Sequence, residues 1–260
     1  MKLNRTFVAG LPHLDVHTLS EDWALATGLE SHWMLMADSL ALRPSQWIDS
    51  HGDRMYGAVI SLQTSFDLDD TIAEDDTFLA ETELVSIRKP HALSSTRYTV
   101  NGKARAEVRL LTSFIKRSER GSNKKFSKVR DLWKAEDVNG EMIDQALTRH
   151  HEAKSEAAGG PLAMVYEVNR IQDFNTADFL YFKNFVRIAK AAEWRGNRGQ
   201  PARLNSAREC FYFGNVEDGD SVMAHVERSG DRARTVLLAE DGRRLFLSNA
   251  TTPPVSIAVR

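Results

Sequence analysis

The sequence is poor in the features that mark secreted, membrane and metal-binding proteins. It contains one cysteine, Cys210, which excludes an internal disulfide and a cysteine-based zinc site. Its N-terminus has no basic segment followed by an apolar one, and no apolar run approaches the roughly 18 residues of a membrane-spanning helix. No glycine-rich phosphate loop and no Ser-His-Asp pattern stands out. We therefore expect a cytoplasmic protein without a bound metal or cofactor and without membrane association.

Charge of either sign is not in large excess. The net charge of −2 gives no overall signature of nucleic-acid binding, so no nucleic-acid partner is expected. The hydrophobic share of 42% and the charged share of 27% are ordinary for a globular protein. A chain of 260 residues is long enough for one large domain or for two domains of about 100–150 residues, each with its own core.

The hydrophobic pattern divides the chain into two similar halves. In the first half, helical spacing predicts a helix at residues 20–42. Strand-like segments follow it at residues 54–64, 77–89, 92–100 and 107–115. The second half is predicted to contain a strand at 163–170, a helix at 175–194, and strands at 207–214, 221–229, 232–240 and 243–250. A basic connector at 116–134 and a polar helix at 141–157 lie between the halves.

Each half thus contains one long helix followed by an antiparallel meander. A helix wrapped by a curved antiparallel sheet, present twice, describes an α+β double hot-dog fold. We expect the N-terminal half at residues 1–120, the basic connector and polar helix at 121–160, and the C-terminal half at 161–260. Two unrelated α+β domains in one chain would give the same pattern.

The segment DFNTADFLYF at residues 173–182 joins a polar turn to the start of the second predicted helix. Asn and Thr side chains accept hydrogen bonds from the free N–H groups of a helix start, and this end attracts negative charge. The segment resembles the loop and central helix of hot-dog acyl-thioester enzymes, whose usual catalytic acid aligns with Asn175. An amide cannot act as a base, so the resemblance implies acyl-thioester binding without ordinary hydrolysis. A simple helix cap is the alternative role for Asn175.

A second resemblance spans most of the chain. Its segments are GLPHL at 10–14, LSEDW at 19–23, SHW at 31–33, DRMYGA at 53–58, LTSF at 111–114 and YFGN at 212–215. They are similar to the double-hot-dog bifunctional acyltransferase/decarboxylases of polyketide biosynthesis, of which the leinamycin-pathway enzyme is the type member. In that family a tyrosine after the first helix is acylated, and Tyr56 has the matching position. The resemblance implies that a (methyl)malonyl group is taken from coenzyme A, decarboxylated, and delivered to an acyl carrier protein.

A tyrosine nucleophile needs help to attack a thioester, because the reference pKa of a phenol is near 10. Arg54 lies two residues from the tyrosine, and His13 and His32 are further candidates for the cation or base. The predicted helix start at Asn175 and Thr176 would supply hydrogen-bond donors to the oxygen of a thioester enolate.

Thr112 and Ser113, near the end of a predicted strand, are also candidate donors to the substrate. Several of these candidate residues also fit a purely structural role. Tyr56 and His32 fit packing positions at the edge of a core, and Thr112 and Ser113 fit polar strand ends.

The expected partners are acyl-coenzyme A as substrate and an acyl carrier protein. The basic connector at 116–134 would bind the 3′-phosphate of coenzyme A or an acidic helix of the carrier protein, unless it is only a soluble linker. Two competing functions stay open: a hot-dog thioesterase or dehydratase acting on a carrier-bound intermediate, and a non-catalytic acyl-binding pathway protein. Either a monomer or a homodimer is compatible with the pattern.

Overall fold

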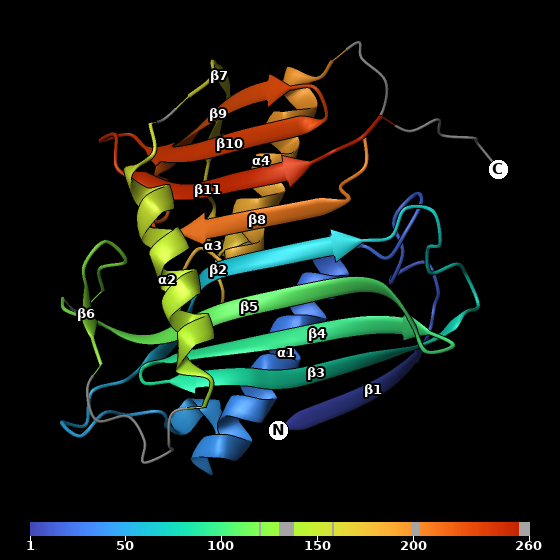
Figure 1. Ribbon diagram of the computed structural model, residues 1–260. Coiled ribbons are helices and arrows are strands. Elements are labelled where there is room, and N and C mark those ends of the chain that lie inside the picture. The colour runs from blue at the N-terminus through green and yellow to red at the C-terminus, as the bar shows by residue number, and fades with distance from the viewer. Residues whose placement is uncertain (120, 130–137, 158, 199–202, 255–260) are drawn as a thin grey trace.

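The computed structural model describes residues 1–119, 121–129, 138–157, 159–198 and 203–254. One large sheet runs in the order β1-β3-β4-β5-β2-β8-β11-β10-β9-β7, with β6 beside β5 (Figure 1). All of its pairings are antiparallel. The strands are β1 (Lys2–Val8), β2 (Tyr56–Phe66), β3 (Thr77–Arg88), β4 (His91–Val100), β5 (Lys103–Arg117), β6 (Phe126–Lys128), β7 (Leu162–Glu167), β8 (Ala207–Tyr212), β9 (Ser221–Ser229), β10 (Arg232–Ala239) and β11 (Arg244–Thr251).

The two halves of this sheet have the same strand order. From the outer edge inward, the N-terminal half reads β1-β3-β4-β5-β2, and the C-terminal half reads β7-β9-β10-β11-β8. The halves meet where β2 pairs with β8, from Ser61 opposite Phe211 to Ser65 opposite Ala207. The chain therefore repeats one topology and joins both copies into a continuous sheet.

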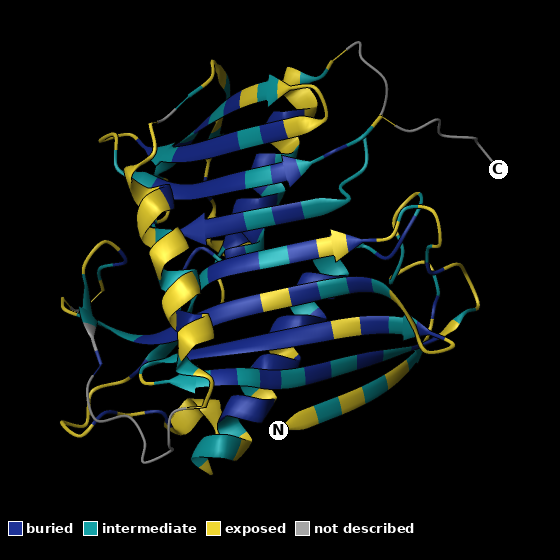
Figure 2. Ribbon diagram, in the orientation of Figure 1, coloured by how far each residue is buried: buried dark blue, intermediate teal, exposed yellow. Residues whose placement is uncertain are grey.

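Two long helices cover one face of the sheet and a third crosses the other face (Figure 1). α1 (Glu21–Leu40) packs on the N-terminal strands, and α4 (Phe182–Gly196) packs on the C-terminal strands. A single cluster of buried apolar side chains lies beneath both helices and includes Leu25, Leu62 and Val186. On the opposite face, α2 (Gly140–Ser155) is largely exposed (Figure 2). The core therefore lies between the sheet and the pair α1 and α4.

Similar turns precede α1 and α4. The Oδ1 atom of Asp15 accepts hydrogen bonds from the backbone N–H groups of His17 and Thr18. The Oδ1 atom of Asn175 accepts from those of Ala177 and Phe179. An isolated antiparallel bridge closes each turn. The repeat of the fold thus extends to the hydrogen bonds that lead into each central helix.

Most predicted helices and strands are present within a few residues of their expected limits. The predicted helix at 175–194 is an exception, because α4 begins at Phe182. The Asn175 side chain and the left-handed backbone of Asp178, with φ of 60°, close the preceding residues into a turn. The pattern also does not predict β1, an edge strand in which exposed and half-buried residues alternate. Part of the basic connector, residues 120 and 130–137, lies outside the described residues.

Arg208 on β8 lies beneath both central helices and connects the two halves. Its guanidinium donates to the carboxylate of Glu193 on α4 at 2.8 and 3.0 Å, and to that of Glu21 on α1 at 3.2 Å. Burial opposes the positive charge, but the two carboxylates raise the pKa of Arg208 above its ordinary value. Glu193 also accepts a hydrogen bond from Thr235 of β10. α1, α4 and the sheet therefore share one buried network of charges.

We expect Glu193→Ala to lower the free energy of unfolding by about 3–5 kcal/mol, because the variant leaves the Arg208 charge buried with less compensation. Urea denaturation followed by circular dichroism measures this change. Glu240→Ala is the control, since Glu240 is exposed and its removal is expected to change the free energy by no more than about 0.5 kcal/mol. Equal losses in the two variants would contradict the role given to the buried network.

In the described part of the chain, no helix has the length and apolar character needed to cross a membrane.

Candidate functional site

A cavity of about 230 Å³ lies where β2 and β8 separate. The two strands pair only as far as Ser61 and Phe211. Beyond that point β2 continues beside β5 alone, and β8 continues beside β11 alone. The start of α4 and the α3–α4 loop, residues 174–181 after α3 (Arg170–Asp173), lie against this opening. Both halves of the chain contribute walls, so the cavity depends on their association.

The cavity wall is mainly apolar. Its polar side chains are those of Asn175, Tyr181, Tyr212 and Asn215, and no Asp, Glu, His or Cys of the described residues lines it. The apolar wall is formed by Leu29, Trp33, Val59, Ile60, Ile115, Phe126, Phe179, Leu180, Phe182, Phe185 and Phe213. This composition suits an acyl chain better than a charged group.

Gly57 allows the Trp33 ring of α1 to lie directly against β2. A side-chain carbon at position 57 would overlap the indole, so only glycine permits this approach. Both residues line the cavity. The glycine in the sequence DRMYGA therefore has a packing reason to be there, independent of any role in chemistry.

Asp173 anchors the beginning of the α3–α4 loop. Its carboxylate is buried, and it accepts hydrogen bonds from the hydroxyl of Tyr166, the backbone N–H of Asn169 and the guanidinium of Arg187. The Asp173 carbonyl oxygen accepts from the backbone N–H of Tyr181, which lies at the other end of the loop. The two ends of the loop are thus held together next to the cavity.

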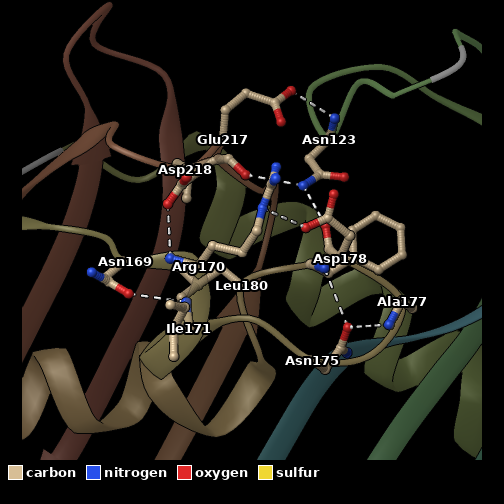
Figure 3. Close-up of polar contacts among 12 residues, drawn as sticks. Asn123, Asn169, Arg170, Ile171, Asn175, Ala177, Asp178, Leu180, Glu217 and Asp218 are labelled. Atoms are coloured by element: carbon tan, nitrogen blue, oxygen red, sulfur yellow. Dashed lines mark hydrogen bonds and ion pairs between the residues drawn. The ribbon is translucent and has the colours of Figure 1, made fainter.

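Residues from distant parts of the chain hold the middle of the loop. The side chain of Asn215 accepts from the Leu180 N–H at 3.0 Å and donates to the Leu180 carbonyl at 3.2 Å. Asn123 and Arg117, from the connector region, donate to the carbonyl of Asp178. Figure 3 shows Asn123 directed toward this part of the loop. The loop is therefore a braced element of the site.

The first turn of α4 opens toward the cavity, since Tyr181 and Phe182 line it. Among the described residues, no side chain caps α4 at Tyr181, whereas the Ser20 hydroxyl caps α1 by accepting from the Trp23 N–H. The first N–H groups of a helix lack partners within the helix and carry partial positive charge. This end of α4 thus offers backbone donors to an oxygen that bears negative charge.

The structure places Asn175 in the cavity wall but not at a helix start. Its side-chain oxygen caps the turn, accepting from Ala177 at 3.0 Å and from Phe179 at 3.2 Å, as Figure 3 shows for Ala177. Thr176 is exposed in the same turn. The helix donors expected at these two positions lie instead at Phe182, because the turn delays the start of α4.

Tyr56, the first residue of β2, is not among the residues that line the cavity, although its chain neighbour Gly57 and its ring partner Phe179 are. Its ring packs edge-on against Phe179, with 5.1 Å between the ring centroids. The guanidinium carbons of Arg117 and Arg54 lie 4.8 and 5.8 Å from the centroid of the Tyr56 ring. Two cations therefore lie near the predicted nucleophile, of which sequence reasoning named one.

His32 is buried in the core between α1 and the sheet. Its ring nitrogens lie 2.9 Å from the Ser94 hydroxyl and 2.8 Å from the Thr112 hydroxyl. Burial lowers the pKa of His32 from its ordinary value of 6.5 to about 3, so the imidazole is neutral at working pH. Neither His32 nor Thr112 is among the residues that line the cavity.

The other predicted site residues lie outside the cavity wall as well. His13 belongs to an aromatic cluster with Phe7 and Trp23, and its Nδ1 accepts a hydrogen bond from the Gly10 N–H. Ser113 is buried on β5, opposite Ala58 of β2. Arg54 is exposed and donates to the backbone carbonyl of Ser45. Of the polar residues predicted for the site, Asn175 lines the cavity, and Tyr56, with Arg54 near its ring, lies next to the lining residues Gly57 and Phe179.

The residues of the site that were not predicted include Arg117, Phe126 and Asn215. Asn215 ends the segment YFGN, which carried part of the family resemblance, and an amide after a strand end was the available signal. Phe126 is an aromatic residue among the charged residues of the basic connector. An aromatic side chain in such a segment is a signal that the residue packs against the rest of the protein. No local signal marks Arg117, because its contacts with the loop join positions about 60 residues apart.

Several cations of the basic connector are paired within the protein. Lys116 lies 2.6 Å from Asp49, Lys124 lies 2.8 Å from Asp220, and Lys125 lies 2.8 Å from Glu119. Arg117 contributes to the site itself. The described part of the connector is therefore attached to the fold and is not only a soluble linker.

Within the ranges that the structure describes, no group of three or more His, Cys, Asp or Glu residues is placed to hold a metal ion.

Comparison with known proteins identifies the fold. Neither a sequence-family model nor a curated protein sequence matches the chain. An acyl-ACP thioesterase from Bacteroides thetaiotaomicron superposes with a TM-score of 0.67 at 12% identity, over 96% of this chain and 97% of that one. The 12:0-ACP thioesterase from Umbellularia californica superposes with a TM-score of 0.69 at 10% identity, over 98% of each chain. The protein has the hot-dog fold of these thioesterases. At such low identities the likeness establishes the fold alone.

The buried imidazole predicts a dependence of stability on pH. Between pH 6.5 and about 3 the unfolded chain binds a proton at His32 that the folded protein does not, so stability falls as the pH falls. Between pH 7 and pH 5 this group is expected to remove about 2 kcal/mol from the free energy of unfolding. Urea denaturation at both pH values, on the wild type and on His32→Gln, isolates the contribution. An unchanged pH dependence in the variant would show that His32 is not buried in its neutral form.

Proposed function

We propose that this protein is a double hot-dog enzyme that binds acyl thioesters in the cavity between β2 and β8. The repeated strand order supports a duplication of the hot-dog unit within one chain. The apolar wall matches an acyl chain, and the uncapped start of α4 supplies donors for the thioester oxygen. The match to acyl-ACP thioesterases over nearly the whole chain supports a thioester substrate carried by an acyl carrier protein.

Within this class we propose acyl transfer through Tyr56 in preference to direct hydrolysis. The observation that carries this choice is the lack of any carboxylate or imidazole among the described residues that line the cavity, because activation of water requires a base. Tyr56 adjoins the lining residues Gly57 and Phe179, and two guanidinium groups lie near its ring. Nearby cations favour an oxygen nucleophile. The phenol oxygen would attack the thioester carbonyl, release the thiol and retain the acyl group as a tyrosyl ester.

The substrate that best fits the family resemblance is a malonyl or methylmalonyl thioester of coenzyme A, with an acyl carrier protein as acceptor. In decarboxylation, the bond to the carboxylate carbon breaks and its electrons form the thioester enolate. Carbon dioxide leaves, and the α carbon then takes up a proton. The N–H groups at the start of α4 would stabilise the enolate oxygen, and the apolar wall would favour loss of the charged carboxylate.

Hydrolysis is the second candidate function. The overall match to two ACP thioesterases, each covering nearly all of both chains, favours it. A water molecule would then need activation by a group outside the described cavity wall. Hydrolysis yields free acid and leaves no acyl-protein adduct, so the two functions differ in a directly measurable product.

Tyr56→Phe is expected to abolish an acyl adduct that the wild type forms with malonyl- or methylmalonyl-coenzyme A, because the variant lacks the nucleophilic oxygen. Intact-protein mass spectrometry measures the gain of an acyl group, with or without loss of carbon dioxide. Tyr181→Phe is the matched control, since Tyr181 lines the same cavity and burial raises the pKa of its phenol. This variant should still form the adduct.

Other outcomes assign the chemistry differently. An adduct that survives in Tyr56→Phe and disappears in Tyr181→Phe would move the nucleophile to Tyr181. Consumption of the thioester without an adduct in any of the three proteins would support hydrolysis. Thioester binding without consumption would indicate a non-catalytic acyl-binding protein.

A further inference from the structure

A second cavity, of about 460 Å³, lies at the C-terminal end of α4 and shares no lining residue with the cavity at the β2–β8 opening. Five basic residues line it: Lys190, Arg198, Arg203, Arg208 and Arg228. The same lining contains one carboxylate, that of Glu193. A cavity whose wall carries this excess of positive charge is suited to binding an anion.

Only part of this positive charge is neutralised within the protein. Arg208 pairs with Glu193 and Glu21, and the Lys190 ammonium lies 3.3 Å from Glu21. In the part of the chain that the structure describes, no carboxylate forms an ion pair with Arg198, Arg203 or Arg228. Within the described residues, these three guanidinium groups therefore line the cavity without a carboxylate in ion-pair distance.

Two of these arginines are held in place by the backbone but retain unused donors. The Arg228 guanidinium donates to the Glu193 carbonyl, and the Arg203 guanidinium donates to the carbonyls of Gly230 and Thr252. The Nε atoms of Arg203 and Arg228 are buried without a hydrogen-bond partner among the described residues. Burial and the neighbouring arginines lower the pKa of Arg228, although Glu193 acts in the opposite direction. Unused buried donors are uncommon in proteins and call for an acceptor.

The wall of this cavity also carries an aromatic surface. Trp194 is 63% exposed, unusually high for an indole, and the Arg198 guanidinium lies 5.0 Å from its ring centroid. The Oδ1 atom of Asn205, another lining residue, is buried without a donor among the described residues. The site thus presents cations, a ring face and one acceptor for a hydroxyl group.

We propose that this cavity binds a phosphorylated small molecule of the nucleotide type. Phosphate oxygens would accept hydrogen bonds from Arg203 and Arg228, which are held by hydrogen bonds and form no ion pair with a described carboxylate. A sugar hydroxyl would donate to Asn205, and an aromatic base would lie on Trp194. The volume of about 460 Å³ falls within the range of small-molecule sites. This binding is independent of the thioester reaction, because the two cavities share no wall.

Isothermal titration calorimetry of the full chain with adenosine 5′-diphosphate, inorganic pyrophosphate and adenosine tests the proposal. We expect saturable binding of the diphosphate nucleotide, weaker binding of pyrophosphate, and the weakest binding of adenosine. Arg228→Gln should weaken nucleotide binding at least tenfold. Trp194→Ala should weaken binding of the nucleotide and leave that of pyrophosphate unchanged, since only the base would contact the ring.

Arg195→Gln is the matched control, because Arg195 is exposed on the same helix end but does not line the cavity. It should bind the nucleotide as the wild type does. Arg198→Gln, at an exposed position, provides a second test that does not depend on the packing around Arg228. Absence of saturable binding, or equal loss in Arg195→Gln and Arg198→Gln, would overturn the proposal. No thioester is present in this experiment, so its outcome is separate from that of the Tyr56 test.

Discussion

The short pairing between β2 and β8 is the constraint on which the rest of the structure depends. It joins the halves only from Ser61 to Ser65, and the register of β2 against β5 shifts between Val59 and Ser61, where that pairing ends. An irregularity of this kind bends a strand and increases its twist. β2 therefore turns away from β8 at the point where the acyl-sized cavity opens. At the other end of the seam, Arg208 binds carboxylates from both central helices and holds the halves together.

At the site, hydrogen bonds hold the α3–α4 loop in place, and the N-terminal end of α4 has no side-chain cap. Asp173 fixes both ends of the α3–α4 loop, and Asn215 fixes its last turn. In the first turn of α4 the Asn184 N–H bonds the Tyr181 carbonyl, whereas no described side chain caps the helix at Tyr181. An uncapped helix end costs stability, typically about 1 kcal/mol. A structure that retains such an end beside a cavity keeps donors available for a ligand.

Hydrophobic periodicity was enough to predict the central helix and most strands of each half, because most of them bury one continuous face. It missed the edge strand β1, in which exposed and half-buried residues alternate. It failed where the outcome depended on a few local hydrogen bonds. The Asn175 side chain accepts from two N–H groups and postpones α4 to Phe182, although the apolar spacing begins earlier. The site was predictable only in part for a related reason. Tyr56 and Asn175 belong to recognisable segments, whereas Arg117 reaches the loop through a tertiary contact that no sequence pattern encodes. His32 fits either a core or a site, and only its burial between two hydroxyls decides.

Joining two similar halves in one chain allows their equivalent positions to diverge. Two identical subunits would place the same cavity at the start of each central helix. Here the start of α1 is capped by Ser20 and its first residue, Glu21, enters the ion network with Arg208. The start of α4 is left without a cap and faces an apolar wall. The start of α1 and the end of α4 meet at Arg208, whereas the start of α4 and Trp33 of α1 lie at the cavity. The charged network and the apolar cavity therefore occupy opposite ends of the two helices. Two unlike halves in one chain thus allow an apolar cavity and a cavity lined by basic residues to lie on one sheet.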